Sequence, residues 1–409
     1  MRGRAVGFVL ALGICSLAVT STAQVAPVWQ RSYGEGQHDL GHDVLLLDDG
    51  GYLLLAESIE QFEPTVVGHA VLYRLASDGE VVWRRTYGGD RTSSGQSMLP
   101  TEDGGCLIVG TIQSEDGGDA ELYLIRVDSN GSELWSGTYG TPLDEYGGKI
   151  VPLRDGGHMI VGNSVDPKDV VADPGAAGYA GFAGRSNVFL VRVDADGREI
   201  WSSRLASPEN TLASGAALAI DGGVVVLSYI LRYPIDDNDI RLFQVDPDGN
   251  EIWSRRWADG KTSGYDMIGT SDGGFLISGI RSYPDDPERA KADALLIKVD
   301  ASGNEEWFVT YGEPDQVETA HAVLETADGR YICVGWQERD LNTWRDDILL
   351  AVFDRDGTPL WQDVTPSGEH NLHEGFSEHP DGSFVIAGSA SRPGRSFCIR
   401  LRKMDPETE

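Results

Sequence analysis

The sequence is poor in cysteine, in basic residues and in long apolar runs, and each shortage excludes a class of protein. Of its four cysteines, Cys106, Cys333 and Cys398 lie inside short apolar stretches far apart in the chain. Cysteine in such a stretch behaves as a small buried hydrophobe. The wide spacings exclude a disulfide framework and a Cys-x-x-Cys metal or redox pair.

Basic residues are outnumbered by acidic ones, 33 to 65, which gives a formal net charge of −32. Nucleic acids and anionic membrane surfaces are bound through basic patches, so the composition argues against both as partners. A solvated acidic surface is the simplest reading, and a cation or a basic partner also fits.

The one long apolar run begins the chain. Residues 1–23 combine a basic start, an apolar core and the small residues Ser21-Thr22-Ala23, which is typical of a secretory signal peptide cleaved after Ala23. Lipid attachment at Cys15 is disfavoured because Ile14 stands where a small residue is expected. Removing two arginines and no acid changes the net charge from −32 to −34. We therefore expect residues 24–409 to form one exported domain, secreted or periplasmic, with no membrane span.

Helical periodicity is absent after residue 23, and a repeat takes its place. Tryptophans recur with successive differences of 54, 52, 66, 52, 54 and 54 residues: Trp29, Trp83, Trp135, Trp201, Trp253, Trp307 and Trp361. An Asp-Gly marker recurs with them: Asp49, Asp103, Asp155, Asp221, Asp272, Asp328 and Asp381. Two independent markers thus give seven copies.

Each copy divides into four short apolar segments separated by Gly, Asp, Asn or Pro, as strands and hairpins require. Four-stranded units repeated seven times predict an all-β fold, a seven-bladed β-propeller. Residues 28–34 form a lone fourth strand, and residues 396–403 form a third strand with no fourth after it. Pairing these two would complete the last blade and close the ring, which an open β-solenoid would not need.

The repeated tryptophan is best explained by packing against the neighbouring blade, since an indole buries a large apolar area. The Asp that ends each third strand, such as Asp128, is expected to bond turn amides, and the Gly after it supplies a positive φ. These residues are predicted to be structural.

The run Asp-x-x-Gly-x-x-x-Trp, as in VDADGREIWSSR (193–204), resembles the tryptophan-docking motif of quinoprotein-like (PQQ-like) propeller repeats. The whole unit resembles the repeats of secreted bacterial propellers over residues 28–403. The resemblance implies the fold. Quinoprotein dehydrogenases resemble one another in adjacent cysteines, a calcium site and a catalytic Asp, commonly on eight blades; no quinone-site residue can be carried over here, and no cofactor is predicted.

One face of the predicted propeller has short turns and the other has long, varied loops, where function tends to lie. The long loops are expected at 58–69, 111–119, 162–187, 229–239, 280–293 and 336–347. The 162–187 insertion contains Tyr179 and Phe182 and suits a lid or contact loop. Calcium is the one cation left open by the loop acids, although solvated carboxylates are the simpler explanation: Asp236, Asp237, Asp239, Asp285, Asp286, Asp346 and Asp347.

A candidate site comes from the first strand of each copy. Seven residues before each Asp-Gly marker stand mostly polar residues: His42, Gln96, Gly148, Ser214, Tyr265, His321 and Glu374. We expect them at the mouth of the central channel, with His42, Gln96, Tyr265, His321 and Glu374 contacting a ligand. Two residues onward the positions are apolar and are expected to form a throat below the mouth: Val44, Met98, Ile150, Ala216, Met267, Val323 and Phe376.

Two functions remain open. The favoured one is a monomeric, non-catalytic binding or scaffold module that takes a protein, glycan or cation ligand through the long-loop face. The alternative is a hydrolase, lyase or quinoprotein-type oxidoreductase at the channel mouth, where His42, His321 and Glu374 supply acid–base groups. The sequence has no phosphate-binding loop, and its one Gly-x-Ser-x-Gly run, at 269–273, coincides with the Asp272 hairpin marker and not with a strand-to-helix elbow, which favours the module.

Overall fold

The computed structural model describes residues 27–36, 38–61, 67–115, 117–166, 168, 185–231, 238–257, 261–283, 292–313, 316–340, 345–365, 371–392 and 395–404. All 28 elements of regular structure within these ranges are β-strands. None of the described segments is a helix long and apolar enough to cross a membrane. The predicted signal peptide lies outside the described residues, as do Tyr179 and Phe182.

The strands form antiparallel four-stranded sheets in chain order. The first two comprise β2 (His38–Leu46), β3 (Tyr52–Gln61), β4 (Val67–Leu75) and β5 (Val81–Tyr87), then β6 (Ser93–Pro100), β7 (Cys106–Gln113), β8 (Ala120–Val127) and β9 (Glu133–Tyr139). The next two comprise β10 (Asp144–Pro152), β11 (His158–Asp166), β12 (Arg185–Val193) and β13 (Glu199–Arg204), then β14 (Asn210–Leu218), β15 (Val224–Leu231), β16 (Asp239–Val245) and β17 (Glu251–Trp257).

Two further sets of four are β18 (Thr262–Gly269), β19 (Phe275–Ser282), β20 (Ala292–Val299) and β21 (Glu305–Tyr311), and β22 (Val317–Glu325), β23 (Tyr331–Asp340), β24 (Arg345–Phe353) and β25 (Pro359–Thr365). One parallel bridge, Ala292↔Val317, links these two sets into an eight-stranded sheet. The last sheet joins the two ends of the chain: β26 (Asn371–Glu378), β27 (Phe384–Arg392), β28 (Arg395–Met404) and β1 (Trp29–Tyr33). In it β1 runs antiparallel to β28, with Trp29 opposite Lys403.

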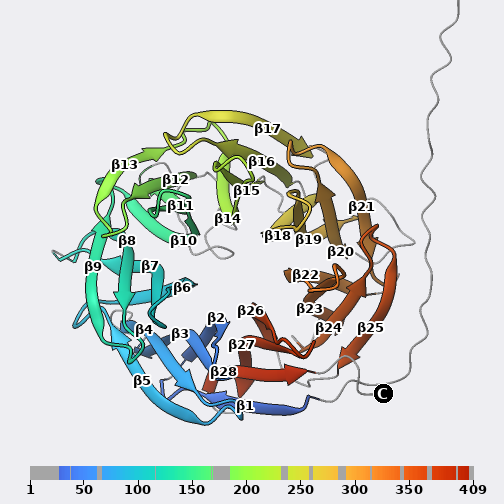
Figure 1. Cartoon of the computed structure of the whole chain (residues 1–409), viewed down its shortest axis with the longest axis horizontal. Coiled ribbons are helices and arrows are strands. Elements are labelled where there is room, and N and C mark those ends of the chain that lie inside the picture. Colours follow the sequence, from blue (N-terminus) through green and yellow to red (C-terminus); the bar gives the residue numbers. More distant parts are fainter. Residues whose placement is uncertain are drawn as a thin grey trace, which may run out of the picture.

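Figure 1 shows these sheets arranged radially about a central space, with the first strand of each innermost and the fourth outermost. This arrangement is a β-propeller, as the repeat predicts. The hydrophobic cores lie between neighbouring sheets. One cluster, for example, packs Leu227 of β15 against Ile277 of β19 and Ile297 of β20.

The Asp-Gly-Gly marker forms the turn between the first and second strands, and each of its three residues is required there for a different structural reason. Asp103 accepts a hydrogen bond from the amide of Gly105 at 3.2 Å, and Gly104 has a φ of +79°. A Cβ on Gly105 would lie 2.0 Å from the carbonyl oxygen of Val127 on β8, so only glycine fits beside the third strand. Arg126 on β8 then binds the Asp103 carboxylate at 2.6 Å and locks the turn to that strand.

The tryptophans contact the turn between the third and fourth strands of the next sheet. A Cβ on Gly131, whose φ is +73°, would lie 2.6 Å from the indole of Trp83 on β5. Tyr87, at the end of the same strand, donates its hydroxyl proton to the carbonyl of Gly131 at 2.9 Å. The same ring-on-glycine contact recurs between Trp29 and Gly79, Trp135 and Gly197, Trp201 and Gly249, Trp253 and Gly303, and Trp307 and Gly357. The Asp before each glycine holds the turn, as Asp128 does by accepting the amides of Asn130 and Ser132.

The predicted long loops are wrong in extent, because the strands continue into them. Ser58 and His69, expected in a loop, are paired residues of β3 and β4. Their polarity is explained by bonding within the sheet, since Ser58 donates to the buried carboxylate of Asp39 on β2 at 2.5 Å. The loop acids need the same correction where they are described: Asp239, Asp346 and Asp347 are buried in β16 and β24, and Asp239 pairs with Arg256 at 2.7 Å. The other four predicted loop acids lie outside the described residues.

Candidate functional site

The innermost strand of every sheet contains a β-bulge, and the bulged residue is the position that the sequence picked out. In β2 the strand register with β3 passes from Gly41 to Asp43 and skips His42. The same shift isolates Gln96, Gly148, Ser214, Tyr265, His321 and Glu374. A bulge frees one residue from the ladder and re-aims its side chain. These seven are called the bulge residues below; they lie in the middle of the inner strands.

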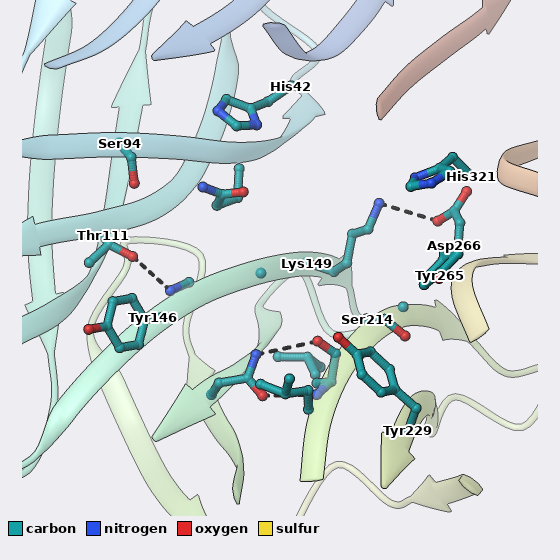
Figure 2. Close-up of a pocket in the computed structure, with 18 residues that line it drawn as sticks. His42, Ser94, Thr111, Tyr146, Lys149, Ser214, Tyr229, Tyr265, Asp266 and His321 are labelled. Atoms are coloured by element: carbon teal, nitrogen blue, oxygen red, sulfur yellow. Dashed lines mark hydrogen bonds and ion pairs between the residues drawn. The ribbon is translucent and has the colours of Figure 1, made fainter. Parts of the chain in front are cut away.

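A cavity of about 490 Å³ lies among the inner strands, and six of the bulge residues line it. Figure 2 shows His42, Ser214, Tyr265 and His321 around this space, contributed by β2, β14, β18 and β22. The side chain of Glu374 lies outside the described part of the chain. The cavity is within the size range of small-molecule sites. It brings together His42, Gln96, Tyr265 and His321, four of the five predicted ligand contacts.

The predicted apolar throat is wrong. The residues two positions after the bulge belong to the hydrophobic cores between sheets and are not among those that line the cavity: Val44, Met98, Ile150, Ala216, Met267, Val323 and Phe376. Regular alternation resumes after the bulge, so these side chains face the neighbouring sheet. These seven positions are therefore apolar because they pack one sheet against the next.

On one side of the cavity two adjacent bulge residues are small. Gly148 on β10 and Ser214 on β14 stand where other sheets present histidine, glutamine or tyrosine. Behind them the wall consists of Tyr146, Asn163 and Tyr229, together with other lining residues. Asn163 reaches across to the next sheet, accepting from the amide of Ala213 at 2.8 Å and donating to its carbonyl at 3.3 Å.

On the next two inner strands, β18 and β22, aromatic rings stack. The ring centroids of Tyr265 and His321 are 4.7 Å apart with an interplanar angle of 24°. The indole N–H of Trp336 on β23 donates to Nε2 of His321 at 3.1 Å. An indole nitrogen only donates, so Nε2 of His321 accepts, and the imidazole carries its proton on Nδ1 in its neutral form. Trp336 thus fixes both the tautomer and the orientation of the ring that Tyr265 stacks on.

Three charged groups follow directly after bulge residues, and the sequence reasoning missed them. Nζ of Lys149 lies 3.3 Å from Oδ1 of Asp266, and this pair spans the cavity in Figure 2. Asp43 is half-buried and accepts the amides of Val44 and Met98, both at 2.8 Å. Burial raises the pKa of Asp43 to about 6, although the charge of Lys149 and the two amide bonds act in the other direction. Reading one residue beyond each bulge residue would have found all three.

Two further polar residues that line the cavity are His42 and Gln96. His42 is 6% exposed, and its Nε2 lies 3.8 Å from the carboxylate of Glu57. The carboxamide of Gln96 makes no hydrogen bond to any described residue. Within the described part of the chain, no group of three or more His, Cys, Asp or Glu residues is arranged to hold a metal ion. The chemistry available is hydrogen bonding, aromatic contact and one compensated ion pair.

A family model described as outer membrane protein assembly factor BamB matches residues 18–231 and 236–402. The chain belongs to this family. The match confirms the quinoprotein-like repeat inferred from the tryptophan motif. No curated protein matches the sequence significantly.

Several solved structures are similar to this member of the BamB family. A puromycin hydrolase is 15% identical with a TM-score of 0.53, over 90% of this chain and 54% of the hydrolase, so the chain spans about half of that protein. A glucose dehydrogenase is 13% identical with a TM-score of 0.44, over 80% and 98% of the two chains. The β-propeller domain of the Trilobed protease from Pyrococcus furiosus is 11% identical with a TM-score of 0.49, over 91% and 95%. The likeness to the hydrolase shows the fold alone.

Proposed function

We propose that the protein is an exported, non-catalytic binding module whose ligand enters the central cavity. The observation that carries the proposal is the convergence of bulge residues from six inner strands on one space of about 490 Å³. These residues are skipped by the register of the strand ladders, and a bulge re-aims the side chain that it carries. The reactive groups near them are already engaged: Lys149 with Asp266, and His321 with Trp336.

The proposal includes seven blades in a closed ring. The two four-strand sets joined by the Ala292↔Val317 bridge count as separate blades, because each has its own inner strand and its own bulge. Closure is supported by the β1–β28 pairing and by a core cluster that packs Leu54 of β3 against Ile399 of β28. A closed ring would hold the inner strands, and hence the cavity, in fixed positions.

Export is proposed from residues 1–23, and residues 24–409 are proposed to form the single propeller domain. The family name refers to the outer membrane, which agrees with an exported location. The net charge of −32 supports a protein, glycan or cation as partner and speaks against nucleic acid. A monomer is the proposed state, and the long-loop face is a second surface for a protein partner.

A thermal-shift screen of the mature protein tests this function. The candidate ligands are calcium, zinc, pyrroloquinoline quinone and a panel of glycans. A binding module should be stabilised by a compound that it does not consume, and Tyr265→Ala and His321→Ala should abolish that shift. Glu374→Ala tests the seventh bulge position. Stabilisation by the quinone together with dehydrogenase turnover, or hydrolysis of a hit, would replace the binding module by the enzyme.

A further inference from the structure

We infer that the ligand of the cavity is a neutral carbohydrate, bound over the side where Gly148 and Ser214 leave room. This inference rests on the proposed binding function and adds the chemical class of the ligand. Three properties of the cavity lead to it: its charge, its uncommitted hydrogen-bonding groups and its tyrosines.

The charges in the cavity favour a neutral ligand. Lys149, the one lysine or arginine among the described residues that line the cavity, lies 3.3 Å from Asp266, and the carboxyl of Asp43 lies in the same electrostatic field. An anionic ligand would have to compete with Asp266 for Lys149 and approach a protein of net charge −32. A cationic ligand would meet the ammonium group of Lys149, whose side chain is 39% exposed, and would compete with it for the carboxylate of Asp266. A neutral ligand avoids both costs.

The uncommitted hydrogen-bonding groups are neutral amides and hydroxyls. The Gln96 carboxamide has two donors and an acceptor and no bond to a described residue. Asn163 keeps its second N–H after its two bonds to Ala213. Ser214 donates to the carbonyl of Gly264 at 2.8 Å, so its oxygen is left to accept. Such groups, which both donate and accept, match sugar hydroxyls, which do the same.

Tyrosines supply the remaining surface. Tyr146, Tyr229 and Tyr265 all line the cavity and are contributed by three different sheets. A pyranose ring has an apolar C–H face and a polar edge of hydroxyls, so it is complementary to aromatic walls combined with amide groups. Burial raises the pKa of Tyr146 to about 12, so its phenol is neutral at physiological pH.

The repeat itself supplies the decisive variant. Ser214→Tyr would put at the β14 bulge the residue that β18 carries at the same place, so the local backbone is known to accommodate it. The new ring would occupy the side of the cavity where Gly148 and Ser214 leave room. Gln96→Leu removes the uncommitted amide at nearly constant volume. Gln113→Leu is the matched control, because Gln113 is exposed at the end of β7 and lies outside the cavity.

The experiment is isothermal titration of the mature protein with maltose, cellobiose and N,N′-diacetylchitobiose, beside digalacturonic acid and deacetylated chitobiose as anionic and cationic probes. We expect at least one neutral disaccharide to bind, with less than about a twofold change in affinity between about 50 and about 500 mM salt. Ser214→Tyr should abolish binding, Gln96→Leu should weaken it about tenfold, and Gln113→Leu should leave it unchanged.

Several outcomes would overturn the carbohydrate inference. They are binding of only a charged probe, no binding of any neutral disaccharide, or binding that Ser214→Tyr and Gln96→Leu leave intact. If Ser214→Tyr does not fold, the affinities of Gln96→Leu and Gln113→Leu for the neutral disaccharide are compared, and a loss confined to Gln96→Leu supports the inference. If a ligand of another class binds and Tyr265→Ala abolishes that binding, the carbohydrate inference is wrong and the proposed binding function still holds. The failure of the inference can therefore be told apart from the failure of the proposed function.

Discussion

Gly197→Ala should destabilise the protein well beyond Gly156→Ala, although the two glycines have nearly the same backbone conformation. Their φ angles are +77° and +88°. A Cβ on Gly197 would lie 2.4 Å from the indole of Trp135, whereas a Cβ on Gly156 would meet no atom within 4 Å. The pair therefore separates the cost of a left-handed alanine from the cost of displacing a tryptophan.

The expected magnitudes follow from these two terms. A left-handed conformation costs a residue with a Cβ about 1–2 kcal/mol, and this is the whole effect expected for Gly156→Ala. Crowding a packed contact adds about 1–3 kcal/mol, so Gly197→Ala should cost roughly 2–5 kcal/mol. In a Trp135→Ala background the ring is gone, and Gly197→Ala should then cost only the backbone term. The double-mutant cycle should show a coupling of about 1–3 kcal/mol.

Differential scanning calorimetry of the four proteins, with Gly156→Ala as control, measures the effect without relying on tryptophan fluorescence. Trp135→Ala alone should also lower the melting temperature, because it removes the contact between sheets. The reasoning is refuted if Gly197→Ala and Gly156→Ala lower the melting temperature equally. It is also refuted if the cost of Gly197→Ala is the same with and without Trp135.

Three further predictions concern single interactions. Tyr87→Phe should cost about 1 kcal/mol in unfolding experiments, because the buried carbonyl of Gly131 loses its donor; no change would mean that another group satisfies it. Hydrogen bonding to Arg126 lowers the pKa of Asp103 to about 2. The ionised Asp103 therefore stabilises the fold above the unfolded pKa, and this stabilisation is lost as pH falls from about 4 to about 2. Asp103→Asn should flatten an acid-unfolding curve in this range, and an unchanged curve would contradict the pairing. Burial raises the pKa of Glu318 to about 7. The protonated side chain therefore favours folding at low pH, and the stability of the protein falls as pH rises to about 7. Glu318→Gln should remove that decline in melting temperature, and a variant with the same pH profile would show that Glu318 does not cause the decline.

The fold was largely predictable because the repeat constrains it in every copy. Tryptophan and Asp-Gly spacing located the strands, the turns and the pairing of the two ends. The partner of the tryptophan was less accessible: Trp83 contacts Gly131, which follows it by 48 residues, and no spacing within one copy indicates that contact. The contact of Tyr87 with Gly131 was missed for the same reason, although the dipeptide Tyr-Gly recurs in the sequence at the end of several fourth strands.

The candidate site was predictable in position and not in shape. Counting from the Asp-Gly marker found the bulge residues, because the inner strands keep a constant distance from bulge to turn. Nothing in the count reveals that the strand register skips these residues, so the apolar positions after them were assigned to the channel and not to the cores. The polar ends of β3 and β4 were misread as loop because Ser58 is satisfied by Asp39, which is distant in sequence.

The bulges also explain how seven similar copies can surround one asymmetric site. A residue in the ladder of an inner strand must pack against the next sheet, as Val44 and Met98 do, and the repeat keeps such positions apolar. A bulged residue is skipped by the strand register, so its size and charge are less constrained by the sheet. That freedom lets Gly148 and Ser214 stand beside Tyr265 and His321 in one ring of equivalent positions. The specificity of the cavity should therefore change with substitutions at the bulges while the melting temperature stays nearly constant.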